Sequence, residues 1–148
     1  MNDNVITKIL ISELAKYNFK KHNSTWSRNV NDVEQKVELQ KSNYGNYYYL
    51  NLYIRLIKIS EKNIPHIAIR INDVATGDIG SSIDSTLSLE TNMNDIDRRT
   101  LLSSLITQCI LPFFEKADSL QKIEKLLRTE LFIQNRSSKQ LKKYFEVS

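Results

Sequence analysis

Residues 46–58 have the sequence NYYYLNLYIRLIK, in which aliphatic side chains alternate with tyrosine and polar side chains. Successive side chains of a β-strand point to opposite faces, so the alternation predicts a strand with two unlike faces. One face carries Tyr48, Leu50, Leu52, Ile54 and Leu56, and the other carries Tyr47, Tyr49, Asn51, Tyr53 and Arg55. We expect helices to cover the aliphatic face and to leave the tyrosine rings available on the other face.

The preceding segment, residues 33–41, alternates in the same way and predicts the hairpin partner of this strand. A two-residue loop at Tyr44-Gly45, with Gly45 at positive φ, sets the register. The core pairs are then Leu39 with Leu50 and Val37 with Leu52, and the outer pairs are Glu34 with Arg55, Lys36 with Tyr53, and Gln40 with Tyr49. A slip of one residue would place aliphatic side chains on the tyrosine face, so this register is favoured.

The same reasoning extends the sheet on both sides. A loop at Asn31-Asp32 pairs Val30 with Val33 and places Trp26 on the core face. Residues 66–72 predict another strand, with the isoleucines inward and Arg70 outward. A fifth strand is expected at residues 81–90, through Ile83, Leu87 and Leu89.

Helical spacing of apolar residues appears at both ends of the chain. Residues 4–17 predict an amphipathic helix that Asn18 ends in a left-handed conformation. A second helix is expected from Asn94, with Pro112 kinking or ending it. Two further helices are predicted, the first capped by Asp118 with Leu131 in its buried stripe, the second capped by Ser137 or Ser138. These elements predict a single α+β domain over residues 1–148: an N-terminal helix, an antiparallel meander of four to five strands, and two to three C-terminal helices on one sheet face.

Composition narrows the class of protein. The chain has 148 residues, of which 41% are hydrophobic and 26% charged, and its one cysteine, Cys109, excludes an internal disulfide. A chain of this length can bury enough surface to form a stable hydrophobic core without a structural metal ion. No signal peptide or membrane-spanning stretch is apparent, so we expect a cytoplasmic protein with no membrane partner. The net charge is +4, yet residues 72–97 contain six acidic and no basic residues.

A search for catalytic or metal-binding patterns finds no phosphate-binding loop, dinucleotide fingerprint, nucleophile elbow or zinc spacing. Cys109 lies on the apolar stripe of a helix, which is typical of a core residue. His22 is expected in a connection and His66 at the start of a strand. We therefore expect no catalytic residues, no metal and no cofactor, and a protein that is not an enzyme.

Two surfaces are candidates for binding a partner. The first is the outer strand face, because tyrosine and arginine are enriched where proteins bind other proteins. The second is the acidic segment, which would suit a basic partner. The candidate residues are Tyr47, Tyr49, Tyr53, Arg55 and Arg70 on the strand face, and Asp73, Asp78 and Asp84 in the acidic segment. Aromatic rings between basic groups also suit nucleic acid, although Glu34 and Glu38 on the same face would repel phosphates. Tyrosine also has a high strand propensity without any binding role.

Several short motifs resemble a bacterial family catalogued as domain of unknown function 4304. They are Tyr17-Asn18-Phe19-Lys20-Lys21, Thr25-Trp26-Ser27-Arg28, Val37-Glu38-Leu39-Gln40-Lys41-Ser42 and Tyr48-Tyr49-Leu50-Asn51-Leu52. Asn18 and Glu38 depart from the glycine and asparagine usual in the family. The resemblance implies no enzymatic activity, and related small domains often accompany bacterial toxins as immunity proteins.

The function expected from these observations is a cytosolic binding protein, specifically an immunity protein that neutralises a toxin by occluding it. The partner would be a protein, such as the cognate toxin, and the oligomeric state is left open. A nucleic-acid-binding regulator and an enzyme with an atypical site are the alternatives. A closed pocket holding Glu34, Arg55 and Arg70 would favour the enzyme.

Overall fold

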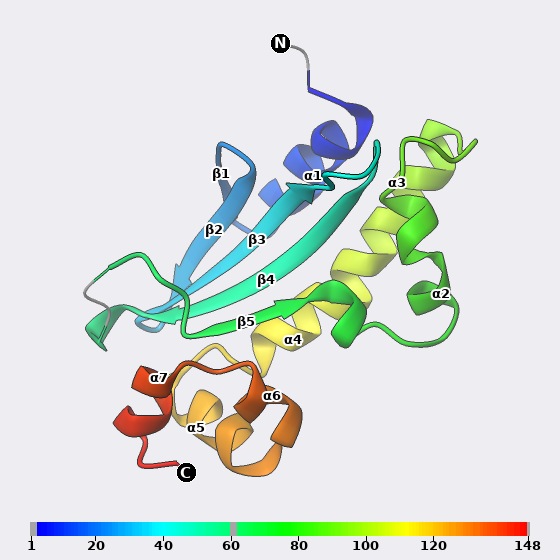
Figure 1. Ribbon diagram of the computed structural model, residues 1–148. Coiled ribbons are helices and arrows are strands. Elements are labelled where there is room, and N and C mark those ends of the chain that lie inside the picture. The colour runs from blue at the N-terminus through cyan, green and yellow to red at the C-terminus, as the bar shows by residue number, and fades with distance from the viewer. Residues whose placement is uncertain (1–2, 60–61, 148) are drawn as a thin grey trace.

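The fold is α+β, as predicted, and the computed structural model describes residues 3–59 and 62–147 (Figure 1). Helix α1 (Val5–Ala15) precedes a five-stranded antiparallel sheet with the strand order β1-β2-β3-β4-β5. The strands are β1 (Lys20–His22), β2 (Thr25–Val30), β3 (Val33–Lys41), β4 (Tyr48–Leu56) and β5 (Ile67–Arg70). The later helices are α2 (Gly77–Thr86), α3 (Asp95–Leu105), α4 (Leu111–Glu115), α5 (Leu120–Thr129), α6 (Leu131–Asn135) and α7 (Lys139–Tyr144).

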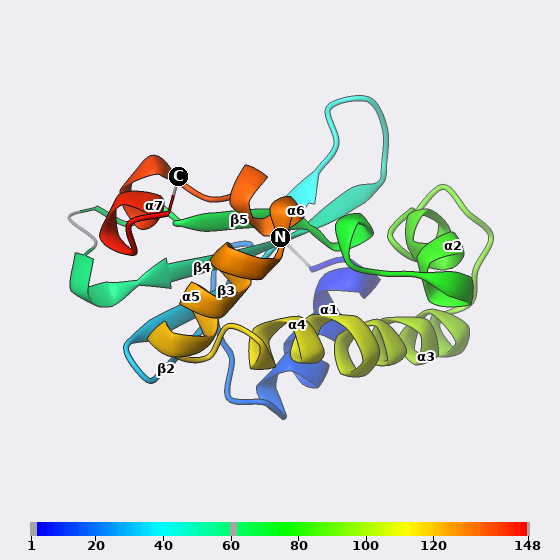
Figure 2. The same ribbon diagram turned by 90° about the horizontal axis from the view of Figure 1, so that it is seen from below.

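Helices α1, α3 and α4 lie on one side of the sheet, and α6 and α7 lie beside the β5 edge (Figure 1 and Figure 2). Helices α1, α3 and α4 pass behind the strands in Figure 1, and in Figure 2 they lie below the strands. The aliphatic side chains of β4 are buried against them, since Leu50, Leu52, Ile54 and Leu56 are fully buried. Asn4 caps α1 and also donates a hydrogen bond to the Tyr48 hydroxyl (2.9 Å). The prediction that helices cover the aliphatic face is confirmed. No described helix has the length and apolar character required to span a membrane.

The predicted register is confirmed throughout the β3–β4 and β2–β3 pairs, with Leu39 opposite Leu50 and Trp26 opposite Val37. Asn31 and Asp32 both have positive φ, which matches the twist of a two-residue hairpin. The Tyr44-Gly45 turn differs from the prediction. The β3–β4 connection is wider than two residues, and Gly45 does not have a positive φ. A Cβ at Gly45 would lie 2.7 Å from Glu90 Oε1 and 2.8 Å from the Tyr47 ring, so these two side chains would have to shift to accommodate any other residue.

The fifth strand predicted at residues 81–90 is wrong. The structure forms helix α2 there, and only an isolated bridge joins Tyr47 to Ser88. Ile83 and Leu87 are four residues apart, a spacing that places both on one face of a strand and equally on one face of a helix. The sheet gains its fifth strand at the opposite edge, where the segment containing His22 forms β1 instead of a connection.

The C-terminal half corrects three details. Helix α3 begins at the predicted Asn94 cap. Of the two effects predicted for Pro112, a kink or an end, the end is wrong, because α3 continues through a π-helical turn, Ile106–Ile110, into α4. Proline lacks the N–H that would close the regular helical ladder at this point, so the wider turn adjoins it. Ser119, rather than Asp118, caps α5, and Leu131 is exposed because α5 ends at Thr129. Ser138 caps α7, as predicted.

A polar side chain lies at the centre of the core face. Gln35 on β3 is fully buried, and its Nε2 donates to the carbonyl oxygens of Phe114 (2.8 Å) and Ala117 (3.4 Å) at the end of α4. Its Oε1 accepts a hydrogen bond from Arg28 Nε (2.9 Å), and Arg28 also donates to the Tyr17 carbonyl (2.9 Å) after α1. The amide adds a side-chain donor at the end of α4, where the Phe114 carbonyl also accepts from Ala117 N–H (3.1 Å). The network of Gln35 and Arg28 therefore ties both helical ends to the sheet.

The C-terminal segment covers the edge of β5. Ser138 N–H donates to the His66 carbonyl (2.7 Å), and Ala68 N–H donates to the Arg136 carbonyl (3.2 Å). The His66 ring is buried, and its Nδ1 accepts a hydrogen bond from Leu56 N–H (2.9 Å). Burial lowers the pKa of His66, with Arg55 nearby acting in the same direction and the Gln140 hydrogen bond opposing it.

Substitution of Gln35 by leucine is expected to lower the free energy of unfolding by about 2 kcal/mol or more, because two carbonyls and the Arg28 N–H lose buried partners. Urea unfolding followed by circular dichroism measures the change. The exposed Gln121 on α5 offers a matched control, and Gln121→Leu should change stability by no more than about 0.5 kcal/mol. Equal effects of the two substitutions would contradict a structural role for the Gln35 amide.

The lowered pKa of His66 predicts a loss of stability in mild acid. Below the ordinary histidine value of 6.5 the unfolded chain binds this proton more readily than the folded chain. The free energy of unfolding should therefore decline as pH falls from about 7 through the unfolded value, at up to roughly 1.4 kcal/mol per pH unit. Urea titrations of the wild type and His66→Asn, whose amide oxygen replaces Nδ1 as acceptor, separate this contribution. A decline of the same slope in both proteins would show that other groups cause it.

Candidate functional site

In the part of the chain that the structure describes, no helix lies over the outer face of the sheet, and strands β3, β4 and β5 place the predicted binding residues on it (Figure 1). Alternation along β4 puts Tyr49, Tyr53 and Arg55 on this face, and each side chain is half-buried. Arg70 reaches the same face from β5, since it pairs with Asn51 in the register. Hereafter this surface of β3, β4 and β5 is called the open face.

The tyrosines of the open face are held in place by their neighbours. The Arg70 guanidinium lies over the Tyr49 ring, 3.9 Å from its centre, and the edge of Tyr47 meets Tyr49 with ring centres 5.9 Å apart. The Tyr53 hydroxyl donates to Glu38 Oε1 (2.7 Å). Burial raises the pKa of Tyr53 to about 12, and the bond to Glu38 acts in the same direction. Tyr53 is therefore a neutral hydrogen-bond donor at physiological pH.

Asn51 links the three strands at the middle of this face. It is the polar member of the alternating β4 sequence, and its side chain is buried beside the two tyrosines. Its Nδ2 donates to Glu38 Oε1 and to Gln40 Oε1, each at 2.8 Å, while its Oδ1 accepts from Arg70 Nε (3.3 Å). The sequence prediction placed Asn51 on this face without recognising its linking role.

Arg55 forms a separate ion pair nearer the β2 side. Its Nε and Nη2 donate to the two carboxylate oxygens of Glu34, at 3.1 and 3.2 Å, and Lys36 Nζ lies 3.7 Å from the same carboxylate. Burial alone would raise the pKa of Glu34, but Arg55 and Lys36 outweigh it and leave that pKa lowered. Glu34 is therefore an ionised partner of Arg55, with no sign of a proton-transfer role.

The acidic segment adjoins the open face instead of forming a separate surface. Asp73 follows β5 and accepts hydrogen bonds from the Arg70 N–H (3.0 Å) and from Arg136 Nη1 (3.1 Å). Asp84 on α2 faces a hollow shared with Tyr47 and Tyr49. Asp78 lies in the first turn of α2, outside the hollows described below. The structure thus joins Asp73 and Asp84 to the tyrosine residues, and it leaves Asp78 apart.

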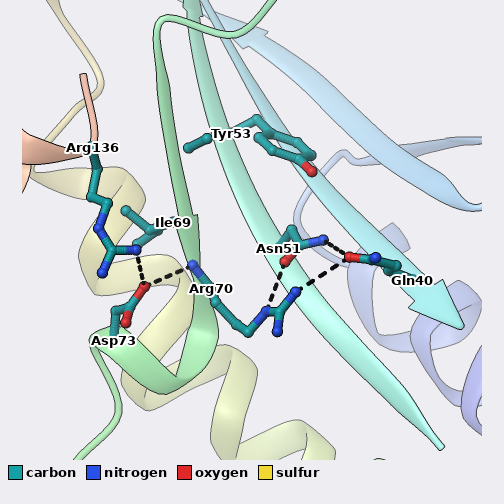
Figure 3. A pocket seen from close by; sticks show the side chains of 8 residues that line it. Gln40, Asn51, Tyr53, Ile69, Arg70, Asp73 and Arg136 are labelled. Carbon is teal, nitrogen blue, oxygen red and sulfur yellow. Dashed lines mark hydrogen bonds and ion pairs between the residues drawn. The ribbon is translucent and has the colours of Figure 1, made fainter. Parts of the chain in front are cut away.

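Three hollows follow one another along this surface. One of about 380 Å³ lies against α2, and its lining includes Tyr47, Tyr49 and Asp84. A middle hollow of about 480 Å³ has Gln40, Asn51, Tyr53, Ala68, Ile69, Arg70, Asp73 and Arg136 as its lining (Figure 3). The third, of about 280 Å³, includes Glu34, Glu38, Tyr53 and Arg55. Tyr53 separates the last two, so Arg70 does not share a pocket with Glu34 and Arg55.

Arg136 was missed as a site residue. It was not among the residues predicted to bind a partner, and the turn after α6 brings it beside Asp73 in the middle hollow. Only its pairing with a distant aspartate reveals this position, and no local pattern in the sequence indicates it.

The other reactive side chains lie away from this surface or are inert. Cys109 is buried in the helical layer, and burial raises the pKa of its thiol, which disfavours the thiolate needed for nucleophilic attack. Among the described residues no cluster of histidine, cysteine, aspartate and glutamate has a geometry suited to a metal ion. The open face offers hydrogen-bond donors, acceptors and aromatic rings, which suit recognition of a partner's surface.

Comparison with known proteins gives one match. No curated protein and no solved structure matches the chain significantly. Residues 10–116 match the family described as domain of unknown function (DUF4304), which covers the sheet, α1 from Leu10, and the helices as far as α4. The chain belongs to the DUF4304 family.

Proposed function

We propose that this chain is a non-enzymatic, cytosolic protein-binding domain that uses the open face to occlude a protein partner. The observation that carries the proposal is the open face itself: half-buried tyrosines and arginines line its hollows, and no helix among the described residues covers them. Tyrosine and arginine dominate the energetics of protein interfaces because they bury large areas and also form hydrogen bonds. The partner we propose is a toxin that the chain neutralises.

Preorganisation of the face supports this role. The Arg70–Tyr49 stack, the Asn51 hydrogen bonds and the Arg55–Glu34 pair restrain long side chains before any partner arrives. Less side-chain entropy is then lost on binding, which favours affinity. A rigid face with several hollows suits a partner that inserts side chains into it.

The charge of the face favours protein over nucleic acid. Acidic residues alternate with basic ones, since Glu34, Glu38, Asp73 and Asp84 lie among Lys36, Arg55, Arg70 and Arg136. Nucleic-acid surfaces need a continuous basic track for the phosphates. One face of the Tyr49 ring is also covered by Arg70, so a base has less of the ring on which to stack.

Replacement of Tyr47, Tyr49 and Tyr53 together by alanine should weaken binding of the partner by about 2 kcal/mol or more, roughly thirtyfold in Kd. The partner is captured from native cell extract with the wild-type chain, purified and titrated by calorimetry. The variant Lys125→Ala, on exposed α5, is the matched control and should bind like the wild type. Unchanged affinity of a folded triple variant would exclude the open face.

Neutralisation makes a further prediction. Expression of the captured partner alone should arrest growth of a host cell, and co-expression of the wild-type chain should restore growth. The triple variant should fail to restore it, because the partner's active surface stays uncovered. A partner that binds the open face without any toxicity would refute neutralisation while leaving protein binding in place.

The nucleic-acid alternative is tested by the dependence of affinity on salt concentration. Affinity for a labelled single-stranded RNA should be negligible at physiological salt if the mixed charges act as argued. Measurement of fluorescence anisotropy between low and physiological salt tests this. Tight binding whose logarithm falls steeply with the logarithm of salt concentration, and which the three tyrosine substitutions abolish, would favour the nucleic-acid alternative.

A further inference from the structure

Arg70 differs from the other arginines of the open face in its partners. Arg55 has the carboxylate of Glu34, and Arg136 has the carboxylate of Asp73. The Arg70 side chain donates to two neutral amide oxygens, Asn51 Oδ1 at 3.3 Å and Gln40 Oε1 at 3.4 Å. Within the described residues no carboxylate lies within ion-pair distance of its guanidinium. Its positive charge is therefore uncompensated by any ion pair described.

The surroundings of Arg70 hold the guanidinium in a fixed position at the middle hollow (Figure 3). Stacking on Tyr49 restrains its plane without consuming any N–H group. The two amide contacts are long, so they orient the group while satisfying it incompletely. Such an arrangement leaves N–H donors for an incoming acceptor, and a guanidinium fork fits the two oxygens of a carboxylate.

Charge complementarity identifies the hollow that an acid would enter. The lining of the middle hollow includes Arg70, Arg136 and Asp73, which together carry one net positive charge. The carboxylate of Asp73 is already engaged by Arg136 and by the Arg70 N–H. Among the described residues that line the hollow against α2, Asp84 alone is charged, and in the third hollow two acidic residues balance two basic ones. Of the three hollows of the open face, the middle one therefore favours an anionic group most.

We propose that the middle hollow receives the side-chain carboxylate of an aspartate or glutamate presented by the protein partner, with Arg70 as its principal donor. This assignment rests on the proposed function. Ile69, Ala68 and the ring of Tyr53 line the hollow beside the charges, which suits the methylene stem of an acidic side chain. Asp73 in the lining and Glu38 beside Asn51 would repel a doubly charged phosphate more strongly than a singly charged carboxylate.

The test uses the full chain and a blocked peptide probe, acetyl-Gly-Glu-Gly-amide, with acetyl-Gly-Gln-Gly-amide as its matched control. Nuclear magnetic resonance follows the Nε–H signals of the arginine side chains during titration. We expect a saturable shift of the Arg70 signal with the glutamate peptide, in the millimolar range, and no shift with the glutamine peptide. Arg55, already paired with Glu34, is the internal control and should not respond. The glutamate peptide should also shift the side-chain amide signals of Asn51 and Gln40, which accept hydrogen bonds from Arg70, and Arg70→Gln should abolish these shifts.

The opposite results would overturn the assignment. These are an unmoved Arg70 signal, equal shifts with both peptides, or a response to inorganic phosphate stronger than the response to the glutamate peptide. If Arg70→Gln does not fold, the comparison of Arg70 with Arg55 in the wild type still decides. Failure here with tyrosine-dependent partner binding intact would remove only the carboxylate site, whereas loss of tyrosine dependence would remove the proposed function itself.

Discussion

The side-chain amide of Gln35 holds the helical layer against the centre of the sheet. It lies on the core face of β3 and binds carbonyl oxygens at the end of α4, while Arg28 connects the same amide to the end of α1. A buried amide of this kind is stable only when all its polar groups find partners, so it specifies one arrangement of helices and strands. With the helices fixed on one side, the other side of the sheet stays open.

The open face follows from that constraint and has its own order. Asn51 joins β3, β4 and β5 through side-chain hydrogen bonds, so the polar side of the sheet is cross-linked much as the apolar side is packed. Most charges on the face are paired within it, and this explains how tyrosines and arginines remain half-buried without a covering helix. Among the described residues Arg70 is the arginine of this face that has no carboxylate partner, and under the proposed function it would orient the face toward an acidic group of the partner.

Local pattern predicted the sheet well and the helical connections poorly. Strict alternation and the Asn31-Asp32 turn determine the register of β2, β3 and β4, because a slip would exchange core and surface. Helix α2 was missed because its few apolar residues, Ile83 and Leu87, fit either period over a short segment. Strand β1 was missed because its three residues are all exposed, so they show no alternation of apolar and polar side chains.

Part of the candidate site was also predictable from the alternation of side chains along the strands. The positions of Tyr49, Tyr53, Arg55 and Arg70 follow from strand periodicity alone, and the structure confirms that they share one face. Whether Arg70 has an acidic partner depends on contacts between segments far apart in the chain. Arg136 lies 63 residues from Asp73, and such long-range contacts leave no trace in local spacing.

The covering of β5 by the segment around Arg136 has a consequence for comparing relatives. The family match ends at residue 116, yet Arg136 forms one wall of the middle hollow. The proposed binding surface is thus a composite of the region that the family model matches and the segment after it. Two family members that both have an arginine at the position of Arg70 can differ in ligand selectivity if the segments after the matched region differ. A shared ligand preference is therefore expected only between relatives that share both regions.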